Sequence, residues 1–298
     1  YGTEKTLETV KLAKMNLAVN GLRGDVQQAN TYYEDPFNSF GSFDYVLANP
    51  PFNVDDVALD AVEGDRRFNT YGVPRNKTKK AAGKAKDTGK DDKAIETVPN
   101  GNYLWINLFA TSLKPQGRAA LVMANSASDA RHSEADIRQK LIEQNLIYGM
   151  LTLPSNLFYT VTLPATLWFF DKAKTDERVL FIDARNIFTQ IDRAHRELSA
   201  EQVQNIAIIP RLHKGRRTEF VALVDSYFQQ GLAQLQETAA HIPDLSTRLL
   251  AMLAEENDAA AQQAGQAAVA GLQAQWANLP TLAQAQAAHD QAQAHNAD

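Results

Sequence analysis

The sequence predicts an α/β fold with a mostly parallel sheet, followed by a helical C-terminal arm. Short β-rich runs alternate with amphipathic helices from residue 1 to about residue 185, a pattern typical of a sheet covered by helices on both faces. Residues 259–298 are rich in Ala and Gln and contain no Lys or Arg, which favours helix but offers little surface for a core. Apolar residues make up 44% of the 298 residues, enough for a sizeable core in the first part.

Apolar spacing and turn signals define each element in turn. The predicted strands span residues 43–48, 118–123, 146–153, 163–170 and 179–182. The predicted helices span residues 6–17 and 103–113, and the second of them is stopped by Lys-Pro-Gln-Gly at 114–117. A third helix begins at Ser133, which forms a capping-box pattern with Asp136. We therefore expect three parts: a core over 1–185, a mixed connecting region over 186–218 and a helical arm over 219–298, partly disordered.

Composition excludes several classes of protein. The chain has no cysteine, so disulfide scaffolds, thiolate zinc sites and thiol nucleophiles are excluded, and a reducing compartment such as the cytoplasm is expected. No apolar run approaches the roughly 18 residues of a membrane span. The six histidines show no metal-ligand spacing, so we predict no metal site, with His132 near a helix start and His195 in a polar helical stretch. The net charge of −5 requires that any contact with nucleic acid come from a local basic patch or a partner.

The basic segment 75–93 is such a patch. It holds eight Lys or Arg against three Asp, lacks apolar periodicity and is predicted to be a long flexible loop. Clustered lysines release counterions on binding DNA, which gives affinity without sequence preference. The candidate DNA contacts are Lys77, Lys79, Lys80, Lys84 and Lys86. The alternative interpretation is a solvated insert with no ligand.

The most specific motif is Asn49-Pro50-Pro51-Phe52, which follows the strand at 43–48 directly. Two prolines fix φ and remove two backbone donors, so the turn presents carbonyl oxygens and the Asn49 amide in a fixed pose. An amine could donate to the Asn49 side-chain oxygen and to the Pro50 carbonyl, which would favour a nucleophilic nitrogen. Phe52 offers a flat face for stacking the ring that carries the amine. The alternative is a rigid turn that merely ends a core strand.

This motif resembles the catalytic motif of N6-adenine DNA methyltransferases that use S-adenosylmethionine. Two further stretches are similar to the methylation subunit of type I restriction–modification systems. The first is Tyr1-Gly2-Thr3-Glu4 with Leu12-Ala13-Lys14-Met15-Asn16-Leu17, and the second is Leu153-Pro154-Ser155-Asn156-Leu157-Phe158 with Leu163-Pro164. The resemblance covers about residues 1–185 and implies a Rossmann-like methyltransferase fold. It also implies DNA, a specificity subunit, a restriction (nuclease and translocase) subunit and a second copy of the chain as partners.

The resemblance also implies roles for single residues. Asn49 and Pro50 would hold the target amino group of adenine, with Pro51 completing the turn and Phe52 stacking the flipped base. Glu4, at a strand end, would bind the ribose hydroxyls of the cofactor. Asn30 matches the position that contacts the cofactor's adenine, where the family often has Asp; the alternatives are a turn residue for Asn30 and a surface carboxylate for Glu4.

One departure from the family is large. No GxGxxG occurs in the 298 residues, and the glycine loop that cradles the cofactor's methionine end is expected upstream of Tyr1. We therefore expect a fragment that lacks the N-terminal part of the fold and that binds cofactor weakly or not at all by itself. Two other functions remain open: transfer of a methyl group to a protein glutamine, since release-factor methyltransferases share an Asn-Pro-Pro-aromatic turn, and a non-catalytic interaction subunit or remnant.

Overall fold

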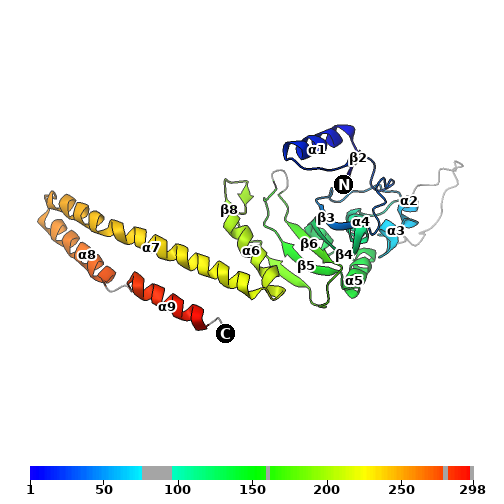
Figure 1. Ribbon diagram of the computed structural model, residues 1–298. Helices are drawn as coiled ribbons and strands as arrows, with labels where there is room; N and C mark the ends of the chain where they lie inside the picture. Colours follow the sequence, from blue (N-terminus) through cyan, green and yellow to red (C-terminus); the bar gives the residue numbers. More distant parts are fainter. Residues whose placement is uncertain (76–95, 159–161, 278–280, 296–298) are drawn as a thin grey trace. The chain divides into compact units, whose positions relative to one another are not determined.

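The computed structural model describes residues 1–75, 96–158, 162–277 and 281–295 (Figure 1). The described chain divides into two compact units, Tyr1–Ala207 and Ile208–Asp298. The strands are β1 (Gly2–Glu4), β2 (Val26–Gln28), β3 (Phe43–Ala48), β4 (Leu113–Ala124), β5 (Ile147–Thr152), β6 (Ala165–Asp171), β7 (Leu180–Asp183), β8 (Thr189–Gln190) and β9 (Arg196–Glu197). The helices are α1 (Leu7–Val19), α2 (Leu59–Glu63), α3 (Arg66–Asn69), α4 (Asn102–Ser112), α5 (Ser133–Glu143), α6 (Ala200–His213), α7 (Arg217–Ala254), α8 (Ala259–Ala277) and α9 (Leu282–His295).

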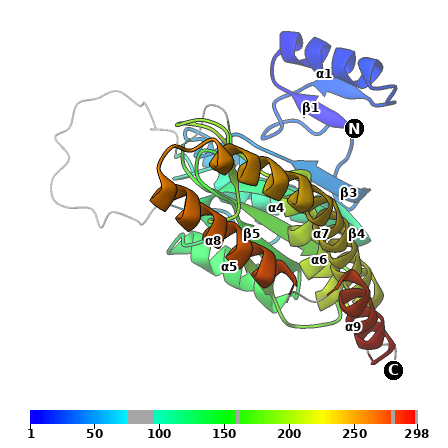
Figure 2. The same ribbon diagram turned by 90° about the vertical axis from the view of Figure 1, so that its left-hand side faces the viewer.

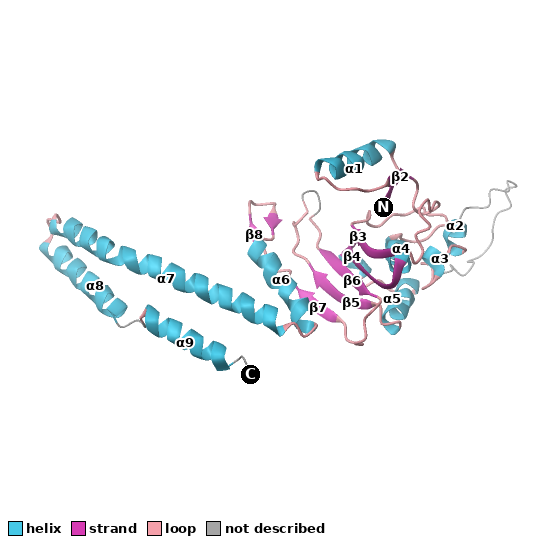
Figure 3. Ribbon diagram, in the orientation of Figure 1, coloured by secondary structure: helices cyan, strands magenta, loops and turns pink. Residues whose placement is uncertain are grey.

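The first unit is built on a five-stranded sheet with the order β3-β4-β6-β5-β7 (Figure 3). Strands β3 and β4 pair in parallel, as do β5 and β7, whereas β6 is antiparallel to both of its neighbours. Four strands therefore point one way and β6 points the other, which confirms the predicted mostly parallel sheet. Strands β1 and β2 form a separate parallel ladder, which α1 packs against.

Side chains that alternate along the strands supply two cores, one on each face of the sheet. Leu121 and Trp168 are fully buried on the face covered by α4 and α5. Val122 and Leu167, their neighbours in sequence, belong to a second cluster, which Ile206 of α6 completes on the opposite face. The views in Figures 1 and 2 show α4 and α5 together on one side of the sheet. The predicted helices on both faces are thus confirmed for the described residues.

Strand β3 lies at the edge of this sheet. Val46 and Ala48 pack on the core beneath α4, but Tyr45 and Leu47, which point the other way, are 75% and 83% exposed. The carboxyl end of β3 is therefore open to solvent on one face, next to the turn that follows it.

The structure differs from the sequence predictions in three local features. Helix α4 ends at Ser112, as predicted, but β4 begins at Leu113 rather than at residue 118. Phe43 pairs with Leu113 and Tyr45 with Arg118, so residues 114–117 form a bulge within β4 that accommodates Pro115. Ser133 does not cap α5; its Oγ bonds to the backbone of Arg75, and His132 occupies the N-cap position with a φ of 59°. His195 lies between β8 and β9 rather than in a helix, because its Nδ1 contacts Asp192 at 2.6 Å and closes a hairpin turn.

The second unit is helical, as the sequence predicts. Helix α7 packs against both α8 and α9. The ring of Phe228 stacks on His289 with 4.0 Å between ring centroids, and the His289 ring also contacts the Asp225 carboxylate. Among the described residues, no helix combines the length and the apolar character needed to cross a membrane.

Candidate active site

A cavity of about 810 Å³ lies where β1, β2 and β3 end. Glu4 ends β1, Asn30 follows β2, and Asn49, Pro50 and Pro51 follow β3; all five residues line the cavity. The structure therefore gathers five of the sequence-predicted site residues around one space. Its volume falls within the range of small-molecule and cofactor sites, and its position at strand carboxyl ends is where α/β sheets bind ligands.

The turn after β3 presents its polar groups to this cavity. Asn49 is exposed, and its amide has no hydrogen-bond partner in the part of the chain that the structure describes. Pro50 is buried, whereas Asn49 and Pro51 on either side of it are exposed. Of these three residues, only Pro50 is therefore packed against the protein. Phe52 is half-buried and is not among the residues that line the cavity.

Glu4 and Asn30 face the cavity from the neighbouring ladder. The Ala29 amide donates to the Glu4 carbonyl at 3.0 Å, which continues the ladder past its last residue pair. The Glu4 Oε1 accepts a hydrogen bond from the Lys5 backbone at 2.8 Å, which leaves Oε2 for a ligand hydroxyl. The Asn30 Oδ1 accepts from the Tyr32 backbone at 3.2 Å, which leaves the Nδ2 protons for a ligand acceptor.

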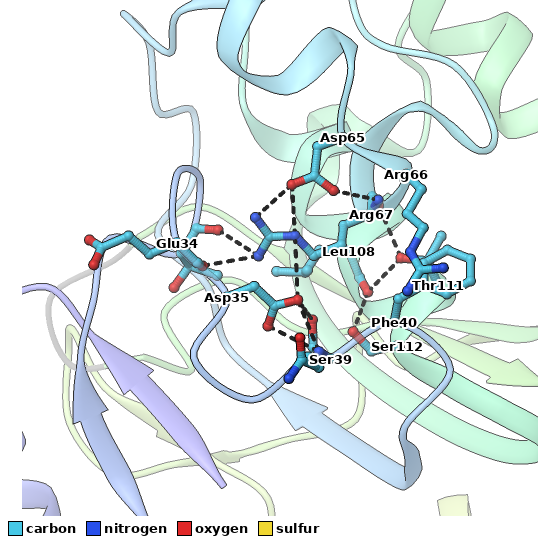
Figure 4. Close-up of polar contacts among 12 residues, drawn as sticks. Glu34, Asp35, Ser39, Phe40, Asp65, Arg66, Arg67, Leu108, Thr111 and Ser112 are labelled. Atoms are coloured by element: carbon cyan, nitrogen blue, oxygen red, sulfur yellow. Dashed lines mark hydrogen bonds and ion pairs between the residues drawn. The ribbon is translucent and has the colours of Figure 1, made fainter.

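A buried arginine holds the wall that carries Asn30 (Figure 4). Arg67 is 5% exposed and lies in α3. Its Nη1 donates to the carbonyls of Thr31 at 3.2 Å and Glu34 at 3.0 Å. Its Nη2 donates to Asp65 at 2.7 Å, and its Nε lies 3.8 Å from the Asp35 carboxylate. One guanidinium thus ties the loop after β2 to α3.

Arg67 also lowers the pKa of Asp65. Partial burial acts to raise the pKa of Asp65, but hydrogen bonds from Arg67 outweigh it, so the pKa lies below its usual value of 3.8. Asp65 is therefore ionised at neutral pH and the ion pair is intact.

We expect the stability that this pair contributes to be lost in acid. A carboxylate whose pKa is lower in the folded chain stabilises the fold above the unfolded-state pKa, and the contribution disappears as the pH falls through the folded-state pKa. The free energy of unfolding should therefore fall more steeply between about pH 5 and pH 3 in the wild type than in Asp65→Asn. Urea denaturation at a series of pH values measures both slopes, and equal slopes would contradict the prediction.

Two buried polar atoms also belong to the cavity wall. Tyr32 and Trp105 are each 8% exposed, and their rings lie 4.8 Å apart between centroids. Neither the Tyr32 Oη nor the Trp105 Nε1 has a hydrogen-bond partner among the described residues. Burial raises the pKa of Tyr32, so its hydroxyl is neutral at physiological pH.

The predicted DNA-binding lysines, Lys77, Lys79, Lys80, Lys84 and Lys86, lie outside the described residues. Within the described ranges, no group of three or more His, Asp or Glu residues could hold a metal ion.

Comparison with known proteins identifies the family. The N-6 DNA methylase family matches residues 1–226, about three quarters of the 298-residue chain. The chain belongs to the N-6 DNA methylase family. The match covers every residue that lines the cavity and ends within α7.

Individual relatives agree with this assignment. The methylase subunit of the type I restriction enzyme MjaIX of Methanocaldococcus jannaschii is 36% identical over 211 residues, covering 69% of this chain and 34% of that protein. The HindI methylase subunit of Haemophilus influenzae is 31% identical over 210 residues, covering 70% and 42%. This N-6 DNA methylase family member therefore spans about a third to two fifths of the length of those relatives.

A solved structure supports the fold. The type I restriction–modification methyltransferase subunit of Streptococcus thermophilus superposes with a TM-score of 0.60 at 24% identity, covering 71% of this chain and 41% of that one. At this identity the likeness establishes a shared methyltransferase fold, as the sequence predicted.

Sequence reasoning missed several residues of the cavity wall. Arg67, Tyr32 and Trp105 carry no motif, and each reads locally as a helix or core residue. The pair Arg67 and Asp65 has the spacing of an ordinary helix cap, and nothing in it points to the loop after β2. These roles follow from contacts between segments distant in the chain.

Proposed function

We propose that the protein is the methylation subunit of a type I restriction–modification system, which transfers a methyl group from S-adenosylmethionine to the N6 amino group of adenine in DNA. The observation that carries the proposal is the cavity, where the Asn49-Pro50-Pro51 turn faces Glu4 and Asn30 from an adjacent ladder. One wall offers acceptors for an amine and the other offers groups for a nucleoside, so a donor and an acceptor could meet between them.

The target amine would bind at the turn. Asn49 Oδ1 and the Pro50 carbonyl would each accept one proton of the exocyclic amine, which orients the nitrogen lone pair toward the methyl donor. Neither prolyl nitrogen carries a proton that could compete for these oxygens. Catalysis by this turn would then rest on positioning and on acceptors fixed in advance, with the amine's proton leaving after transfer.

The residues present fit the nucleoside end of S-adenosylmethionine. The free Glu4 Oε2 suits a ribose hydroxyl, and the Asn30 Nδ2 suits a ring nitrogen of adenine. When bound, the cofactor supplies an electrophilic methyl group on a sulfonium.

The partners follow from the relatives, which are named as methylase subunits of type I restriction enzymes. We propose that the chain assembles with a specificity subunit that selects the DNA site, with a second copy of itself and with a restriction subunit. An enzyme that modifies the cell's DNA acts where that DNA is, so we place the complex in the cytoplasm.

The test uses the protein with any coding sequence that precedes residue 1 retained, co-expressed with its neighbouring specificity subunit. The complex is incubated with S-adenosylmethionine and DNA that lacks adenine methylation, and N6-methyladenine is quantified by nucleoside mass spectrometry. We expect methyladenine that depends on both the cofactor and the complex. Cofactor binding without methyladenine would point instead to a glutamine acceptor, and failure of both would indicate an interaction protein.

A further inference from the structure

Three asparagines join the catalytic turn to the core. Asn53 directly follows the Asn49–Phe52 motif, and Asn100 and Asn102 stand at the start of α4, 47 and 49 residues further along the chain. The Asn53 backbone amide donates to Asn102 Oδ1 at 2.9 Å. The Asn53 Oδ1 accepts from Asn102 Nδ2 at 2.9 Å and from Asn100 Nδ2 at 3.0 Å.

Two backbone donors fix the orientation of these amides. A backbone N–H can only donate, so the Asn102 atom that faces the Asn53 amide must be oxygen. The Asn102 backbone amide donates to Asn100 Oδ1 at 2.8 Å, which fixes Asn100 in the same way. Both side-chain NH₂ groups then point at Asn53 Oδ1, so every bond of the network has a donor and an acceptor.

The network is anchored in a rigid part of the molecule. Asn102 is 3% exposed, and Tyr103 and Leu104, which follow it in α4, are fully buried. The Gly101 amide donates to the Val54 carbonyl at 2.7 Å, which adds a backbone bond between the same two segments. A side chain at Gly101 would meet this carbonyl at 3.1 Å, so the glycine allows the close approach.

The turn requires an external anchor for a physical reason. Pro50 and Pro51 have no backbone N–H, so the turn cannot be closed by hydrogen bonds from those two residues. Asn53 leaves the turn with a φ of 54°, in the left-handed region that non-glycine residues seldom occupy without support. The two prolines restrict φ, but they do not determine where the turn stands relative to the cavity.

We propose that Asn100 and Asn102 are positioning residues for methyl transfer, which act through Asn53 to hold Asn49 and the Pro50 carbonyl in the attack geometry. This inference rests on the proposed function, because it takes the amine of the substrate to bind at that turn. Neither asparagine is among the residues that line the cavity, so their effect on the reaction is indirect.

Three variants of the complex separate the contributions. Asn102→Ala removes both bonds between Asn102 and Asn53. Asn53→Gly retains the left-handed backbone and the N–H bond to Asn102 and removes only the side-chain acceptor. The matched control is Asn145→Gly, which makes the same change at a φ of 55° on the connection between α5 and β5, remote in the sequence from the turn.

We expect kcat of Asn102→Ala to fall on the order of 100-fold, because a misplacement near 1 Å at a reacting group has that effect. Asn53→Gly should show a smaller loss and Asn145→Gly none. The KM and the Kd for S-adenosylmethionine should remain within about threefold of the wild type in all three, since Glu4 and Asn30 stand on a different ladder. Unchanged kcat in Asn102→Ala, or a parallel loss of cofactor affinity, would overturn the proposal.

A second measurement does not depend on methylation. Hydrogen–deuterium exchange of a peptide spanning residues 52–55 should be about tenfold faster in Asn102→Ala, the effect of roughly one net hydrogen bond, and unchanged in Asn145→Gly. Equal exchange in Asn102→Ala and the wild type would show that the asparagines do not hold the turn. If the wild type forms no methyladenine, the proposed function fails, whereas the exchange result still decides whether the network holds the turn.

Discussion

Replacement of Asn49 by alanine is expected to abolish methyl transfer and to leave the fold intact. The Asn49 side chain is exposed at the cavity and makes no hydrogen bond within the described residues, so its removal costs the folded chain little. The same change deletes one of the two acceptors proposed for the target amine. Loss of one fixed polar group that acts on the reacting atoms lowers kcat by about 100- to 1,000-fold.

The measurement is N6-methyladenine formed per complex, with the thermal unfolding midpoint of each variant as a check on folding. Asn49→Asp is the matched comparison, since a carboxylate also accepts hydrogen bonds and occupies nearly the same volume; it should retain more activity than the alanine variant. Wild-type turnover in Asn49→Ala would remove the proposed role of the turn.

Replacement of Arg67 by methionine is expected to be among the most destabilising single changes in the first unit. The guanidinium is 5% exposed and bonds to two backbone carbonyls and the Asp65 carboxylate. Methionine fills much of the same space but leaves the carbonyls of Thr31 and Glu34 without their donor and Asp65 without the guanidinium, although the backbone amide of residue 67 still donates to Asp65 Oδ1. Removing one partner of a buried ion pair costs about 3–5 kcal/mol of unfolding free energy, and the partial exposure of Asp65 places the expected value near the lower end of that range.

Urea denaturation provides the test, with Arg66→Met as the matched control. Arg66 is the preceding residue in α3, but it is exposed and lies 4.2 Å above the Phe40 ring, so its loss should cost less than about 1 kcal/mol. Arg67→Lys should recover only part of the stability, because an ammonium cannot reproduce the planar fork that reaches both carbonyls and Asp65. Equal stability of Arg66→Met and Arg67→Met would refute the role assigned to Arg67.

The loss of Arg67 should also weaken cofactor binding, because the loop that it holds carries Asn30. The Kd for S-adenosylmethionine, measured by calorimetry at a temperature where the Arg67→Lys variant is folded, should rise. In the Asn102→Ala variant, by contrast, kcat should fall and the Kd for S-adenosylmethionine should be retained. Together the two variants separate the wall proposed to bind the nucleoside from the turn proposed to bind the amine.

The sheet and the Asn49–Phe52 turn could be predicted because their signals are local. Runs such as Phe43–Ala48 alternate between the two faces of the sheet, and that alternation is visible in the sequence. The bulge at 114–117 could not be predicted, because a proline and a glycine indicate a stop unless the neighbouring strand is known. Ser133 likewise had the pattern of a helix cap, but its hydroxyl instead accepts a hydrogen bond from the backbone of Arg75, which is distant in the sequence.

By itself, the sequence determined the five strands β3 to β7 of the main sheet, helices α1, α4 and α5, the helical arm and the Asn49–Phe52 turn, since hydrophobic periodicity and the rigidity of proline act over a few residues. Only the tertiary structure decided what holds that turn and the facing wall in place. Arg67 reaches Thr31 across 36 residues, and Asn102 reaches Asn53 across 49. Hydrogen bonds of this kind depend on where the fold brings buried polar groups together, and no local sequence pattern predicts which groups become neighbours.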